Sequence, residues 1–284
     1  MNKTIATIAR TTEILSKYHL YPNKGYGQNF IIEPKVVEKI ANNSHIDKKT
    51  AVIEIGPGIG ALTEQLAIIA GHVLAFEIDR KLMDVLTETL ADYPNVRIEN
   101  QDFLTCDLVK YYLDLKDKYS SVVITANLPY YITTPIIFKI IESAIEVDCL
   151  TFMVQREIAD RFSAKPNTKD YNALSVIIQY LYDIEQIMKI SSSIFIPKPA
   201  VDSIVIQLRP KQTKKVNDNQ QFFHFIKACF TQRRKTIYNN LKVDWCDTIR
   251  VLDCLSKAEI DPSRRAESLT LAEFINLYEV AYES

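Results

Sequence analysis

Four adjacent residues, Asn127-Leu128-Pro129-Tyr130, combine an amide, an aromatic ring and two backbone carbonyls directly after the apolar run 122–126. The β-branched run predicts a buried strand that Pro129 ends, and open α/β sheets bind ligands at the carboxyl ends of their strands. The side-chain oxygen of Asn127 and a carbonyl of Leu128 or Pro129 can accept both N–H groups of an exocyclic amine, while Tyr130 stacks on a flat heterocycle. The alternative is an ordinary turn, because a four-residue motif alone is weak support.

A glycine-rich turn, Gly56-Pro57-Gly58-Ile59-Gly60, follows another predicted strand. Glycines tolerate positive φ and let a ligand approach the backbone, and the helix that follows offers free N–H groups. The G-x-G-x-G spacing differs from the G-x-G-x-x-G of dinucleotide sites, so a pyrophosphate cradle is less well supported. A carboxylate, such as the methionine end of S-adenosylmethionine, fits the same turn.

Acidic residues stand at the ends of the next two predicted strands. Glu77 follows the glycines by about 20 residues, where a carboxylate can accept hydrogen bonds from both hydroxyls of a ribose. Asp102 can accept from an adenine amino group, and Phe103 or Ile78 can pack against the ring. For each acid taken alone, a solvated carboxylate in a loop is the simpler interpretation. With Asn127 at a fourth strand end, the set favours a nucleoside site.

The elements that position these residues alternate short apolar strands with helical segments between residues 50 and 155, which predicts an α/β fold with a parallel, doubly wound sheet. Strands are expected at 51–55, 73–77, 96–99, 122–126 and 150–154, and a late, antiparallel edge strand at 203–208. Helices are expected at 61–70, 81–91, 135–144, 158–163, 174–181, 222–230, 231–241, 248–256 and 271–280. The expected domains are a catalytic domain at 1–210, with an N-terminal extension at 1–24, and a small all-α domain at 211–284, entered through a polar linker at 210–221.

Composition narrows the class of protein. The chain has 284 residues, of which 47% are hydrophobic, enough to bury a full core. No apolar run approaches the roughly 18 residues of a membrane span, and residues 1–24 lack the apolar region of a secretory signal. The five cysteines are scattered without C-x-x-C spacing. We therefore expect a cytoplasmic protein with reduced thiols and no metal site, and the four dispersed histidines are assigned to the surface or to packing.

The charge of the chain is unevenly distributed, although its net value is only −1. Residues 211–242 carry eight Lys/Arg and one Asp, whereas residues 243–284 carry four Lys/Arg and nine Asp/Glu. This alternation predicts a basic patch just after the catalytic domain.

The motifs together resemble the KsgA family of small-subunit rRNA adenine N6-dimethyltransferases over nearly the whole chain. The resemblance includes 27–31, 54–63, 77–80 and 127–135. It continues through 153–159, 195–203 and a predicted helix with Arg233-Arg234-Lys235, which are not general methyltransferase features and so identify the family. The resemblance implies a Rossmann-like class I S-adenosylmethionine-dependent methyltransferase that dimethylates two adjacent adenines near the 3′ end of small-subunit (16S) rRNA during ribosome biogenesis.

The resemblance also places the site. Cofactor contacts are expected at Asn29, Ile31 (through its backbone), Gly56, Glu77, Asp102 and Asn127, to which the reasoning above adds Gly58, Ile78 and Phe103. The pocket for the target base is Asn127, Leu128, Pro129 and Tyr130. Phe195 either closes this pocket or is a plain hydrophobic plug. Asn172 departs from the family pattern, which has glycine there, but asparagine also tolerates left-handed geometry.

The implied partner is small-subunit rRNA within a pre-small ribosomal subunit, bound by a monomer. A base inside a helix cannot enter the pocket, so the target must be unpaired or flipped out. Phosphates dominate affinity for nucleic acid, and we assign their binding to Arg233, Arg234 and Lys235, with support from Arg156 and Arg161. For each of these, a solvated helix face is the alternative.

Three other functions compete with this interpretation. The nearest is a resistance-type methylase acting on large-subunit rRNA, against which Pro57, Leu128 and residues 197–203 argue. The second is a methyltransferase-like protein that acts as a ribosome-assembly or transcription factor. The third, a nicotinamide dehydrogenase, is disfavoured by the glycine spacing and by the lack of a placed proton donor.

Overall fold

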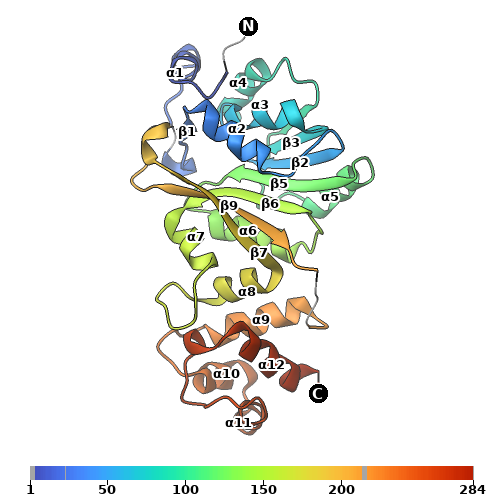
Figure 1. Cartoon of the computed structure of the whole chain (residues 1–284), viewed down its shortest axis with the longest axis vertical. Helices are drawn as coiled ribbons and strands as arrows, with labels where there is room; N and C mark the ends of the chain where they lie inside the picture. Colours follow the sequence, from blue (N-terminus) through green and yellow to red (C-terminus); the bar gives the residue numbers. More distant parts are fainter. Residues whose placement is uncertain (1–3, 23, 213–215, 284) are drawn as a thin grey trace. The chain divides into compact units, whose positions relative to one another are not determined.

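The computed structural model describes residues 4–22, 24–212 and 216–283 (Figure 1). The chain divides into two compact units, the first formed by 1–156 and 185–209 and the second by 157–184 and 210–284. Residues 157–184 thus group with the C-terminal helices. The boundary between residues 209 and 210 lies one residue before the expected end of the catalytic domain at 210. The division into a catalytic and a C-terminal domain stays a prediction.

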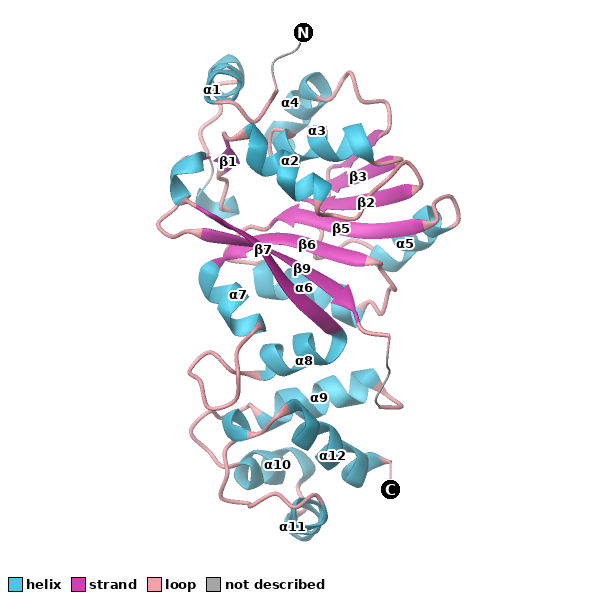
Figure 2. Cartoon of the chain, viewed as in Figure 1, coloured by secondary structure: helices cyan, strands magenta, loops and turns pink. Residues whose placement is uncertain are grey.

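A seven-stranded sheet with the order β4-β3-β2-β5-β6-β9-β7 confirms the predicted α/β fold (Figure 2). Its first five strands in that order are mutually parallel, and β9 runs antiparallel to β6. The apolar runs of β2, β3, β5 and β6 are buried on both faces, as in other parallel sheets, whereas β4 at the edge is partly exposed. The strand bounds are β2 Thr50–Ile55, β3 His72–Phe76, β4 Val96–Glu99, β5 Ser121–Asn127, β6 Cys149–Gln155, β7 Tyr182–Ile190 and β9 Ser203–Pro210.

The sheet edge differs from the prediction. The late strand β9 is antiparallel, as expected, but it lies between β6 and β7, and β7 forms the edge. No strand was expected at 182–190, where only Tyr182 and Ile190 are buried and the adjacent apolar pair Ile187-Met188 breaks the alternation of a strand. Two further strands, β1 (Phe30–Ile31) and β8 (Phe195–Ile196), pair with each other outside the main sheet.

Helices cover both faces of the sheet, with α2, α3 and α4 on one side and α5 and α6 on the other (Figure 1). Helices α1, α2 and α5 were not expected from the sequence, and the first turn expected for α4 is a separate 3-10 turn. The bounds are α1 Ile8–Lys17, α2 Pro34–Asn42, α3 Ala61–Ile69, α4 Met83–Thr89, α5 Leu108–Lys116 and α6 Thr133–Glu142. The loops at the carboxyl ends of β2, β3, β4 and β5 are left to form a site.

Within its described residues, the second unit consists of helices and loops apart from the first residues of β7 and the last residue of β9. It packs around aromatic side chains, including Phe222, Phe225 and Tyr278. Asn172 is extended, with φ −156°, so it does not use the left-handed geometry that asparagine tolerates. Its side chain instead caps α8, accepting from Leu174 N and Ser175 N. The bounds are α7 Arg156–Phe162, α8 Ala173–Leu181, α9 Asn219–Cys229, α10 Ile237–Trp245, α11 Thr248–Lys257 and α12 Leu271–Tyr282.

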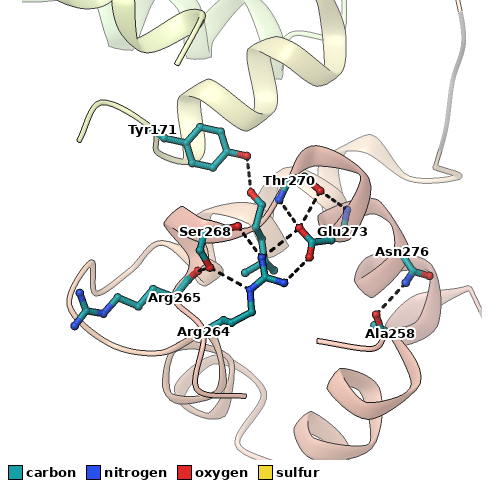
Figure 3. Close-up of polar contacts among 9 residues, drawn as sticks. Tyr171, Ala258, Arg264, Arg265, Ser268, Thr270, Glu273 and Asn276 are labelled. Atoms are coloured by element: carbon teal, nitrogen blue, oxygen red, sulfur yellow. Dashed lines mark hydrogen bonds and ion pairs between the residues drawn. The ribbon is translucent and has the colours of Figure 1, made fainter. Parts of the chain in front are cut away.

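The start of α12 is held by Arg264, which Figure 3 shows at the centre of a polar cluster. Its guanidinium pairs with the carboxylate of Glu273 and donates to the carbonyl of Ser268 at 2.7 Å. Thr270 and Glu273 form a reciprocal capping box, and the Tyr171 hydroxyl donates to the neighbouring Leu269 carbonyl at 2.9 Å. The two neighbouring arginines therefore differ. The side chain of Arg264 holds the local structure together, whereas the exposed side chain of Arg265 points away from the cluster (Figure 3).

Candidate active site

One cavity at the carboxyl ends of β2, β3 and β5 gathers the residues that the sequence assigned to the cofactor and to the base pocket, but not Phe195. This follows from the parallel register, because parallel strands end at the same edge of a sheet. The lining residues include Asn29, Ile31, Gly56, Gly58, Glu77, Ile78, Asp102, Phe103, Asn127, Leu128, Pro129 and Tyr130. Residues about a hundred positions apart thus meet in one place, although their individual roles stay predictions.

The glycine turn is open to a ligand at Gly56. This residue has φ +69°, and a Cβ built on it would meet nothing within 4 Å. The space beside it belongs to the cavity, and α3 begins a few residues later with its free N–H groups. A carboxylate placed here would meet backbone donors and the positive end of a helix dipole, so the turn fits the methionine end of S-adenosylmethionine.

Glu77 is buried between two backbone donors. Its Oε2 accepts from Gly58 N at 3.2 Å and its Oε1 from Asp79 N at 2.8 Å, while only 4% of the residue is exposed. Burial, only partly offset by these hydrogen bonds, raises the pKa of the carboxyl to about 7. Each oxygen keeps a lone pair for a further donor, which is what a ribose diol requires.

A second buried acid, Glu54, lines the same cavity and was not singled out from the sequence. It is 1% exposed, and its Oε2 has no hydrogen-bond partner among the described residues. Burial raises the pKa of this carboxyl to about 8. The signal in the sequence was a lone acid inside the apolar run of β2, since a charged residue in a doubly covered strand is rarely buried without a reason.

The end of β4 offers an acceptor and an apolar wall. Asp102 Oδ1 accepts from Leu104 N at 2.9 Å, and its other oxygen accepts no hydrogen bond from the described residues. Phe103 is 4% exposed and packs edge-on against Phe76. Ile78 is 43% exposed and lines the cavity, so it is the better placed of the two to cover a purine ring.

The loop before β1 crosses toward the end of β5. Asn29 Nδ2 donates to the Gly27 carbonyl at 3.0 Å, and Asn127 Nδ2 donates to the Asn29 carbonyl at 3.4 Å. With its N–H side turned to Asn29, Asn127 presents Oδ1 as a free acceptor. Phe195, which pairs with Ile31, is 3% exposed, belongs to the core and is absent from the cavity wall, and this supports the plug interpretation.

The carbonyls of the four-residue motif are not equivalent. The Pro129 carbonyl accepts from Ile132 N at 3.2 Å and from the hydroxyl of the buried Thr133 at 3.0 Å. Both of its lone pairs are therefore used. Among the described residues no group donates to the Leu128 carbonyl, and the N–H of Leu128 donates to the Met153 carbonyl at 3.1 Å. Of the two carbonyls that the sequence left open, that of Leu128 is available to a ligand.

The basic residues occupy different settings. Arg161 pairs with Glu157, and Arg233 pairs with Glu267 at 3.1 Å and donates to the Lys169 carbonyl at 2.8 Å. Arg234 and Lys235 are exposed. Arg156 is the first residue of α7 and belongs to the first unit. Lys214 and Lys215 of the basic segment lie outside the described residues.

The segment Arg233-Arg234-Lys235 is not helical, so the helix expected at 231–241 was wrong at its start. Helix α10 begins only at Ile237, because Thr236 caps it by accepting from Asn239 N. The loop before it is braced by the buried Asn240, which donates to the Cys229 carbonyl at 2.7 Å and accepts from Gln232 N at 3.1 Å. The loop is thereby held in one shape with its basic side chains outside.

Within the described part of the chain, no cluster of three or more His, Cys, Asp or Glu side chains is arranged to hold a metal ion. No helix among the same residues is long and apolar enough to cross a membrane.

Comparison with known sequences gives matches along nearly the whole chain. The family description "Ribosomal RNA adenine dimethylase" matches residues 21–283. The "Ribosomal RNA small subunit methyltransferase A" of Oceanobacillus iheyensis is 44% identical over 287 residues, covering 99% of this chain and 98% of that protein. A protein of the same name from Geobacillus sp. is 45% identical over 283 residues, covering 98% and 97%.

Solved structures share the fold. A dimethyladenosine transferase from Plasmodium falciparum superposes with a TM-score of 0.74 at 25% identity, covering 87% of this chain and 95% of that one. The 23S rRNA methyltransferase ErmE superposes with a TM-score of 0.65 at 26% identity, covering 89% and 99%. Identity is thus markedly higher to the two small-subunit enzymes than to ErmE.

Proposed function

Since the chain belongs to the ribosomal RNA adenine dimethylase family, we propose that it dimethylates N6 of two adjacent adenines near the 3′ end of small-subunit rRNA, with S-adenosylmethionine as methyl donor. The observation that carries the proposal is the single cavity that brings Asn127-Leu128-Pro129-Tyr130 beside the glycine turn and Glu77. The choice of the small subunit rests on the names of the relatives at 44–45% identity. The enzyme would act as a monomer on a pre-small subunit in the cytoplasm.

The cavity fits S-adenosylmethionine by the chemistry of its walls. The turn at Gly56 would hold the methionine carboxylate, Glu77 the ribose hydroxyls, and Asp102 the adenine amino group under Ile78. When bound, the cofactor supplies an electrophilic methyl group on a sulfonium. Asn127, the first residue of the motif that would hold the target base, lines the same cavity.

The motif residues would prepare the nucleophile. Adenine N6 reacts poorly because its lone pair is delocalised into the ring. Asn127 Oδ1 and the Leu128 carbonyl would accept its two N–H groups, which favours a tetrahedral nitrogen and aims the lone pair at the methyl group, while Tyr130 stacks on the base. Orientation and fixed dipoles can together lower a barrier by several kcal/mol. The cationic product sheds a proton to water, so no strong base is required.

The loop before α10 would contact phosphates through Arg234 and Lys235, with Arg233 and Asn240 holding its shape. Replacing Arg234 or Lys235 by alanine is expected to weaken binding to small-subunit RNA several-fold and to reduce the salt slope by about 1 per side chain, as for a lost phosphate contact. Binding titrations between low and physiological salt measure both. The control Lys110→Ala removes an equally exposed charge from α5, and an equal loss in it would refute a local contact.

The proposed function is tested by transfer of labelled methyl groups from S-adenosylmethionine to undermethylated small ribosomal subunits, with large-subunit RNA as the comparison. The expected result is N6,N6-dimethyladenine in the small-subunit rRNA only. Labelling of large-subunit RNA alone would move the protein to the resistance-type class. Tight binding to the subunit without transfer would leave it an assembly factor.

A further inference from the structure

The hydroxyl of Tyr130 is hydrogen-bonded to the first residue of strand β9. Tyr130 Oη and Ser203 Oγ share a hydrogen bond of 2.7 Å, and Ser203 is 1% exposed at the start of β9. Strand β6 lies between β5, which Tyr130 follows, and β9. The hydroxyl of Tyr130 therefore reaches a buried partner on a strand that is not a neighbour of β5.

This bond leaves the tyrosine ring little freedom to change its place. The backbone at its base is held by the two hydrogen bonds to the Pro129 carbonyl, and a tyrosine side chain has only two rotatable torsions. With both ends held, the long axis of the ring points in one direction, although the hydroxyl lies on that axis and leaves rotation of the ring about it unrestricted. The ring remains partly exposed and lines the cavity, so one side of it is accessible to a ligand.

Ser203 is itself rigidly placed. It lies opposite Gln155 in the antiparallel pair of β6 and β9. The residue before it, Asp202, accepts from Ser192 N at 2.8 Å through its side chain and from Arg156 N at 3.3 Å through its carbonyl. The segment 197–203, which marks the family in the sequence, thus ends in a fixed hydroxyl aimed at the target-base pocket.

We propose that Ser203 is a positioning residue, which through its hydrogen bond to Tyr130 holds the ring in the place where it receives the target adenine. This inference rests on the proposed function, since it assigns the Tyr130 ring to the base. Ser203 does not touch the substrate itself. Its removal would allow the tyrosine side chain to leave this place by rotation about χ1, so that bound adenines would often be misaligned with the methyl donor.

The test is a double-mutant cycle with Ser203→Ala and Tyr130→Phe, both of which delete the bond while keeping the aromatic ring. Each single variant is expected to lower kcat/KM for small subunits about tenfold, as for one hydrogen bond of about 1.4 kcal/mol, with KM for S-adenosylmethionine unchanged. The double variant should be no worse than either single one. Ser203→Thr, which retains a hydroxyl, should recover most of the activity.

Two outcomes would overturn the proposal. One is a Ser203→Ala enzyme as active as the wild type, and the other is losses that multiply in the double variant. Tyr130→Phe leaves Ser203 in place, so it tests the bond even if Ser203→Ala folds poorly. An inactive wild-type chain would refute the proposed function, whereas an active wild type with a silent Ser203→Ala refutes this inference alone.

Discussion

Replacing Asn127 by alanine is expected to lower kcat for methyl transfer to small subunits by about 10² to 10³-fold, the usual cost of removing one preorganised polar contact to a reacting group. Its free Oδ1 is the side-chain acceptor that the motif presents at the end of β5. Without it, only the Leu128 carbonyl would orient N6, and the nitrogen lone pair would stay in conjugation with the ring. Single-turnover transfer of labelled methyl groups measures the loss directly.

Controls separate this effect from unfolding. Asn127 is partly exposed and its hydrogen bond to the Asn29 carbonyl is long, at 3.4 Å, so thermal unfolding should change little. Asn127→Asp keeps an acceptor oxygen at the same place and should retain more activity than the alanine variant. An alanine variant that keeps a tenth or more of the wild-type rate would show that Asn127 does not prepare the nucleophile.

The chemistry-bearing loops could be predicted from the sequence because they follow strongly apolar strands. Strands buried on both faces have continuous β-branched runs, so the end of β5 and the acid at the end of β3 could be located, and the parallel register then brought them together. The same logic fails at the edge of the sheet. The strand β7 is half-exposed and polar, and neither run length nor alternation identifies it.

What the sequence left open was decided by local hydrogen bonds. Composition cannot say which of two adjacent carbonyls is already occupied, and only the side chain of Thr133, one turn later, removes Pro129 from the candidates. Nor can charge alone separate Arg233, held by Glu267, from the exposed Arg234 beside it. Such distinctions depend on hydrogen-bond and ion-pair partners elsewhere in the chain, which cannot be predicted from a pattern of residue types.

A change in pH should alter cofactor binding through Glu77. Burial raises the pKa of its carboxyl to about 7, and hydrogen bonds from a ribose diol favour the ionised form. Below pH 7 the free enzyme holds a proton that binding must displace, so affinity for S-adenosylmethionine should fall about tenfold per pH unit there and level off above it. Calorimetric titration with the stable product S-adenosylhomocysteine, from pH 5.5 to 8, checks the dependence on pH.

The stability of the free protein should respond in the opposite direction. Because the pKa of Glu77 is higher in the folded chain than its ordinary value, its contribution is complete below that ordinary value and is lost as pH rises through about 7. Glu54, with a pKa raised to about 8, extends the loss to higher pH. The free chain should therefore unfold at a lower temperature at pH 8 than at pH 6, and bound cofactor should reduce the difference.

Glu77→Gln tests both effects at once. Glutamine offers one oxygen to the diol and turns an NH₂ group toward the N–H of Gly58 or Asp79, so affinity should fall about 10 to 100-fold, or about 1–3 kcal/mol. Its binding should no longer vary between pH 6 and 7, and any remaining dependence should centre near 8, where Glu54 titrates. The prediction is wrong if the variant keeps the pH profile of the wild type, because the proton released on binding would then come from another group.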